Sequence, residues 1–99
     1  MARVTGVYRV DAKARQFFGS ERVHLICRGD RVVGRFGRHG AIDGQVEGRA
    51  FLARFRSPAG EGWIEATFNE RFNAFEGSYG VDSGKALGSV SATKVTRAR

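Results

Sequence analysis

The chain of 99 residues carries 17 Lys and Arg against 10 Asp and Glu, which gives a net charge of +7. This length holds one domain and leaves no room for a second, and no apolar run approaches the roughly 20 residues that a membrane span requires. The single cysteine, Cys27, excludes an internal disulfide, and Met1 is followed by a strand pattern without an apolar signal region. We therefore expect a cytoplasmic protein with a single domain over 1–95 and a basic tail over 96–99.

The positive charge is mostly arginine, which supplies 14 of the 17 basic residues. The planar guanidinium favours the recognition of carboxylates and phosphates. Gly, Ala and Val are also abundant, so a compositional bias of the whole chain is the alternative explanation. The charge indicates an anionic partner without requiring one.

Apolar and polar residues alternate in short stretches that recur about every ten residues, and this period of two predicts strands. An apolar-x-Gly-x-apolar phrase marks several of them, among them Val32-Gly34-Phe36. The predicted strands cover residues 3–10, 22–28, 31–37, 41–48, 50–57, 63–68, 74–79 and 85–95.

The connections between these strands differ in length. Residues 11–21 break the alternation and form the longest one, in which Asp11 can cap one helical turn. The only proline, Pro58, lies beside glycines in a loop predicted over 58–62. Gly29-Asp30 and Gly48-Arg49 are expected to form tight hairpin turns.

Eight sequential antiparallel strands, each with one apolar face, are expected to form a sheet that closes on itself. Closure removes both sheet edges and gives the apolar faces an interior. Glycines that point inward relieve crowding and allow the strands to coil. The predicted fold is therefore all-β, an eight-stranded antiparallel up-and-down meander barrel.

A candidate pocket lies at the end of the barrel where the longer connections meet. The first, third, fifth and seventh strands run toward this mouth, which gathers four aromatic residues there. The alternation adds three more residues, and two phenylalanines of the longest connection are positioned as a lid. The expected ligand-binding residues are Tyr8, Val10, Phe17, Phe18, Phe36, Arg38, Phe55, Ser57 and Tyr79. Such a mouth suits a small apolar or aromatic ligand, whereas rings that simply plug the barrel are the alternative.

Three phrases, Val4-Thr5-Gly6-Val7-Tyr8, Val32-Val33-Gly34-Arg35-Phe36 and Phe75-Glu76-Gly77-Ser78-Tyr79, resemble those of avidin-like and lipocalin-like (calycin-type) meander barrels. In avidins, such phrases imply strands whose glycine and aromatic residues face a biotin pocket, with a polar residue two positions beyond the aromatic one. Val10 and Arg38 stand at these positions here. This departure argues against biotin and leaves the barrel and its mouth as what the resemblance implies.

The predicted outward faces suggest two further surfaces. A basic face on the first three strands comprises Arg3, Arg9, Arg22, Arg28 and Arg35. It supports an alternative function, an interaction module that binds nucleic acid or an acidic protein. Outward apolar residues, which suit the interface of a homo-oligomer, are Val7, Ile26, Val33, Leu52 and Trp63.

Catalytic and metal-binding patterns are weak. His24, His39 and Cys27 are too scattered for a metal site, and the predicted interior holds no paired carboxylates. We therefore expect no metal and no cofactor, and we assign no catalytic residue. A barrel cyclase or isomerase that uses Tyr and His at the rim is the third hypothesis, behind the small-molecule binder and the basic module.

Overall fold

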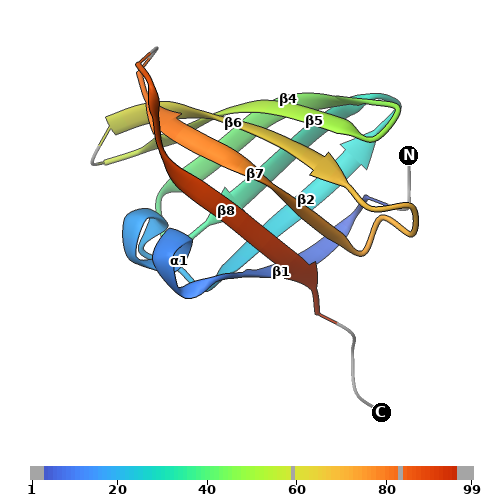
Figure 1. Ribbon diagram of the computed structural model, residues 1–99, viewed down its shortest axis with the longest axis horizontal. Helices are drawn as coiled ribbons and strands as arrows, with labels where there is room; N and C mark the ends of the chain where they lie inside the picture. The colour runs from blue at the N-terminus through green and yellow to red at the C-terminus, as the bar shows by residue number, and fades with distance from the viewer. Residues whose placement is uncertain (1–3, 59, 83, 96–99) are drawn as a thin grey trace.

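The computed structural model describes residues 4–58, 60–82 and 84–95. They form one closed antiparallel barrel in which successive strands pair and β8 returns to β1 (Figure 1). The strands are β1 (Gly6–Val10), β2 (Arg22–Arg28), β3 (Arg31–Phe36), β4 (Gly40–Glu47), β5 (Ala50–Ser57), β6 (Gly60–Phe68), β7 (Ala74–Val81) and β8 (Ala86–Lys94), and α1 (Ala12–Phe18) joins β1 to β2. The predicted eight-stranded meander barrel is confirmed.

The predicted bounds of β2 and β5 agree with the structure, and the other six strands differ from their predicted bounds by one to three residues at one or both ends. The loop expected over 58–62 extends too far, because β6 begins at Gly60 and pairs with β5 from there. The single helical turn expected after Asp11 is instead a helix of seven residues. β1 begins at Gly6, and the predicted residues 1–3 and 96–99 lie outside the described part of the chain.

Burial alternates along the strands as the period of two predicts. In β2 the residues Val23, Leu25 and Cys27 are buried and their neighbours are exposed, and β5 shows the same pattern. The buried side chains form one core inside the barrel. The barrel therefore has an apolar interior and a polar outer face.

β1 is short, and polar contacts complete the seam beside it. It pairs with β8 only from Tyr8 to Val10. The amide of Cys27 donates to the Thr5 hydroxyl at 2.9 Å, beyond the last residue pair that joins β1 to β2. Beyond Val10 the chain leaves the sheet and forms α1, which packs on β8. The helix thus stands where a longer first strand would otherwise continue.

A cluster of aromatic side chains fills the end of the barrel opposite α1, and we call it the distal cluster. Its members are Tyr8, Phe51, Phe68, Phe72 and Phe75. The ring of Tyr8 is wholly buried, and its hydroxyl donates to the carbonyl oxygen of Val4 at 2.7 Å, with the Phe72 carbonyl at 3.3 Å. Tyr8 therefore ties the chain before β1 to the turn between β6 and β7.

We predict that Y8F lowers the free energy of unfolding by about 1–2 kcal/mol, because it leaves a buried carbonyl without its donor. Urea denaturation measures this loss. Y79F is the matched control, since the Tyr79 hydroxyl forms no hydrogen bond with any described residue, and we expect it to change stability by less than about 0.5 kcal/mol. Equal losses in the two variants would contradict a structural role for the Tyr8 hydroxyl.

Stability should also fall at alkaline pH through Tyr8. Burial, with a smaller contribution from Cys27, raises the pKa of the Tyr8 phenol well above its usual range. Above about pH 10 the unfolded chain releases this proton while the folded chain keeps it, so a rise in pH favours unfolding. We expect the free energy of unfolding to fall more steeply from about pH 9 to 11 in the wild type than in Y8F. Parallel profiles would contradict this.

Candidate functional site

The barrel mouth is closed by α1 rather than by the strands themselves. The helix begins after Asp11, whose side chain makes no capping hydrogen bond, and it ends at Gly19. Gly19 adopts a left-handed conformation with φ of 72°, and its amide donates to the carbonyl of Arg15. Figure 1 shows the helix at one end of the barrel beside β8. A helix this short depends on its packing against the barrel.

Five aromatic rings meet beneath the helix, and we call them the mouth cluster. They are Phe17, Phe18, Phe36, Phe55 and Tyr79. The Phe18 ring lies 5.1 Å from both Phe36 and Phe55 and 5.4 Å from Tyr79, measured between ring centroids. Phe17 packs 4.6 Å from Tyr79 but stays half-buried. The two helix residues therefore occupy the space that the three strand residues enclose.

Each strand ring of the mouth cluster lies over a glycine of the next strand. Phe36 pairs with Gly40, Phe55 with Gly62 and Tyr79 with Gly88. A Cβ at Gly40 or Gly62 would lie 2.5 Å or 2.3 Å from a ring carbon of its partner, and at Gly88 it would lie 3.1 Å from the Tyr79 hydroxyl oxygen. Because the glycines have no side chain, the rings lie against the barrel wall. The centre of the mouth is left to Phe18.

The barrel interior is filled in this state. The enclosed void that remains has a volume of about 10 Å³ and is lined by apolar side chains, among them Val10, Phe18 and Ile64. A void of this size has room for about one water molecule and no polar partner for it. The open chamber expected at the mouth is therefore occupied by the helix residues.

The two tyrosines differ in how their hydroxyl groups are satisfied. The Tyr8 hydroxyl, in the distal cluster, donates a hydrogen bond to the carbonyl oxygen of Val4. The Tyr79 hydroxyl lies beside Gly88 and has no hydrogen-bond partner among the described residues. The mouth cluster thus contains one polar group that is free to bind another molecule.

The remaining residues predicted for the mouth are dispersed. Tyr8 was expected with the other rings, and this placement is wrong, because β1 directs it into the distal cluster. Val10 lines the small void. Arg38 is exposed in the turn between β3 and β4, and the Ser57 hydroxyl donates to the carbonyl of Gly60. The structure therefore brings together five of the nine predicted residues.

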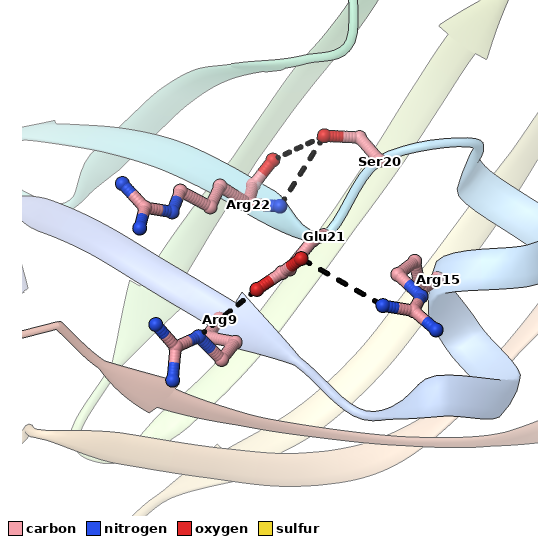
Figure 2. Close-up of polar contacts among 5 residues, drawn as sticks. All are labelled: Arg9, Arg15, Ser20, Glu21 and Arg22. Carbon is pink, nitrogen blue, oxygen red and sulfur yellow. Dashed lines mark hydrogen bonds and ion pairs between the residues drawn. The ribbon is translucent and has the colours of Figure 1, made fainter.

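Charged contacts around α1 are few and exposed. Figure 2 shows Glu21 between Arg9 and Arg15, with distances of 3.3 and 3.7 Å. All three side chains are about half exposed, so each pair contributes well under about 1 kcal/mol. The basic face predicted on strands 1 to 3 is thus partly neutralised at Arg9, while Arg3 lies outside the described residues.

An open groove runs over the outer face of β2, β3 and β4, and its volume is about 980 Å³. Its lining includes Arg22, His24, Ile26, Val33 and Arg35. Within residues 4–58, 60–82 and 84–95, Arg22, Arg28 and Arg35 form no ion pair. The groove is the second place where the structure gathers residues that the sequence singled out.

The outward apolar residues predicted for an oligomer interface do not form one patch. Ile26 and Val33 are directly paired and exposed, and Val7 on β1 is half-buried. Leu52 is exposed between the strand partners Gln45 and Glu65. Trp63 is half-buried, and its indole N–H donates to the carbonyl of Gly84 at 3.0 Å. An oligomer interface stays a prediction.

Sequence reasoning missed two features of the mouth, namely the second turn of α1 and the glycines beneath the rings. Ala12 to Phe18 has too few residues to show a helical period. The loop predicted over 58–62 includes Gly62, and the strand predicted over 41–48 leaves Gly40 outside it. The signal that could have found them is the spacing of each glycine from an aromatic residue on the preceding strand.

Among the described residues, no cluster of three or more His, Cys, Asp or Glu side chains is placed to hold a metal ion. No helix in this part of the chain is long and apolar enough to cross a membrane.

Comparisons with protein-family models, with curated proteins and with solved structures find no match to this chain. The eight-stranded meander is consistent with a calycin-like fold. Function must accordingly be inferred from the geometry of the mouth and of the groove.

The two helix phenylalanines should differ in their effect on stability. F18A removes a ring that is only 9% exposed and touches four others, so we expect a loss of about 3–4 kcal/mol in the free energy of unfolding. F17A removes a half-exposed ring and should cost about 1–2 kcal/mol. Urea denaturation of both variants measures the difference. Equal losses would contradict the insertion of Phe18 into the mouth.

Proposed function

We propose that this barrel binds a small apolar or aromatic molecule at its mouth, and that α1 is a lid that the ligand displaces. The proposal rests on which element supplies the ring at the centre of the mouth. The strands contribute rings that lie against glycines at the wall, and the centre is occupied by Phe18 from a separate element. If the helix moves away, the strands leave an aromatic chamber.

The connections of α1 favour such a movement. Gly19 follows the helix in a conformation that glycine adopts readily, and so provides a hinge. The N-terminus of the helix lacks a side-chain cap, and the ion pairs of Arg15 and Arg9 with Glu21 are exposed and weak. Local opening of a seven-residue helix needs much less free energy than unfolding of the barrel. The cost of opening comes from the contacts of Phe18, Phe17 and the buried Ala14, and from two hydrogen bonds between Asp11 and Ser91 at the start of the helix.

A ligand must therefore replace what Phe18 provides. An aromatic or branched apolar group can occupy the same space among Phe36, Phe55 and Tyr79. The Tyr79 hydroxyl supplies a hydrogen bond that Phe18 cannot use. This favours ligands with an apolar body and one polar group. A relation to avidin-like or lipocalin-like binding proteins belongs to the same proposal, which rests here on the barrel and its mouth.

The proposal is tested with N-phenyl-1-naphthylamine, a neutral apolar fluorophore whose emission rises in apolar surroundings. F18A vacates the chamber, so the fluorophore no longer has to displace a ring. We expect F18A to bind it at least about tenfold more tightly than the wild type, since each 1.4 kcal/mol of avoided cost gives a factor of ten. Titration followed by fluorescence measures both affinities.

F72A is the matched control, because it removes a buried ring from the distal cluster. We expect it to be destabilised without the gain in binding, since α1 still closes the mouth. Similar affinities in F18A, F72A and the wild type would refute the mouth as a binding site.

A further inference from the structure

The outer groove over β2, β3 and β4 has the properties of a second site, distinct in position from the mouth. It is open in the same state in which the mouth is closed, with a volume of about 980 Å³. Much of its lining comes from outward positions of three neighbouring strands, where His24 pairs with Arg35, Arg35 with Ala41, and Ile26 with Val33. Ser20 and Gly37, which precede β2 and follow β3, border one end of it. Ala41 is small, so the side chains on either side stand above it. The groove is therefore built mainly on paired strands of the barrel.

The charges of the groove are concentrated at one end. Arg22, His24 and Arg35 gather toward the mouth end of β2 and β3 and make no ion pair with any described residue. Figure 2 shows the Arg22 side chain extending away from Glu21, while the backbone of Arg22 is bonded to the Ser20 hydroxyl. Two free guanidinium groups on neighbouring strands suit carboxylate groups.

The one carboxylate in the groove is already neutralised. Asp43 accepts two hydrogen bonds from Arg31, at 2.9 and 3.2 Å. It therefore does not offset the charge of Arg22 and Arg35. The groove presents positive charge that no described acidic side chain balances.

The other end of the groove carries an exposed apolar pair beside Asp43, which is the β4 partner of Val33 and is ion-paired with Arg31. Ile26 is 49% exposed and Val33 is 38% exposed, and the two side chains lie opposite each other on β2 and β3. Successive outward residues on a strand are about 7 Å apart, so the apolar pair lies one such step from His24 and Arg35. An occupant must offer apolar groups about one residue pair away from its carboxylates.

These features together favour a peptide over a nucleic acid. Strands β2, β3 and β4, all of whose residues are described, carry no Phe, Tyr or Trp on their outer faces. Single-stranded nucleic acids are usually held by aromatic side chains on which the bases stack. A nucleic acid bound in the groove would place its phosphates or bases against the exposed Ile26 and Val33, which offer no aromatic ring for stacking. Acidic and apolar residues side by side are available in a peptide.

We propose that this groove binds an extended acidic and apolar segment of a partner protein, whose carboxylates meet Arg22 and Arg35 while its apolar side chains cover Ile26 and Val33. The proposal does not depend on a ligand at the mouth. It refines the basic face predicted from the sequence, because Arg9 is engaged by Glu21 and only part of that face lines the groove.

The test uses a fluorescein-labelled peptide, Ser-Asp-Glu-Leu-Leu-Asp-Glu-Ser, and fluorescence anisotropy with the full chain at moderate salt. One control peptide has Asn and Gln in place of the acidic residues, and another has Ser in place of both leucines. We expect the parent peptide to bind at least about tenfold more tightly than either control, because both kinds of contact contribute. R22A/R35A and I26S/V33S should each weaken the parent peptide by a similar factor.

R49A/R71A is the matched control variant, since it removes the same charge from exposed turns at the other end of the barrel. It should leave binding within about twofold. Three results would overturn the proposal. They are an absence of binding by the parent peptide, an equal loss in R49A/R71A and R22A/R35A, which indicates non-specific attraction, and stronger binding of a deoxythymidine oligonucleotide that R22A/R35A abolishes, which indicates a nucleic-acid site.

Discussion

The limited width of an eight-stranded barrel is the constraint on which the rest of this structure depends. A barrel of this size encloses a space that side chains can fill, and packing at native density leaves few voids. At the distal end, strand and turn residues such as Tyr8, Phe68 and Phe72 fill that space themselves. At the mouth the strands do not, and the helix after β1 supplies Phe18 to complete the core. One end of the barrel is therefore filled by strand and turn residues, and the other end is filled by a residue of a separate helix.

The glycines opposite the mouth rings explain this difference. An aromatic residue paired with a glycine covers the space left by the missing side chain, and this arrangement occurs in the hairpins β3–β4, β5–β6 and β7–β8. In the distal half, the inward glycines Gly44 and Gly77 instead pair with Ala53 and Ala66, which lets adjacent strands approach and coil. Glycine thus sets the curvature of the sheet in one half and the position of the rings in the other.

The sequence predicts the barrel well because its signals are local and repeated. Alternation over β2 and β5 identifies both strands to the residue, and Gly29-Asp30 and Gly48-Arg49 mark their turns. The placement of Tyr8 fails because strand parity gives the side of the sheet and says nothing of how far along a tilted strand a ring reaches. The helix after Asp11 is underestimated because tertiary packing of Ala14 and Phe18, rather than local propensity, stabilises it. The positive charge of the groove depends on which arginines lie beside acidic residues, and those neighbours follow from the strand register across the closed barrel.

The mouth and the groove meet in a single segment of chain. Gly19 ends the helix and is its proposed hinge, Ser20 and Arg22 line the groove, and Glu21 pairs with Arg9 and Arg15. Phe36 likewise borders the groove and packs against Phe18. A movement of α1 about Gly19 therefore acts on the residues that open into the groove. If the groove ligand and the mouth ligand each bind more tightly to one conformation of residues 19–22, each ligand changes the affinity of the other by the same factor. The two sites are distinct in chemistry, and this short segment is the physical connection through which one can influence the other.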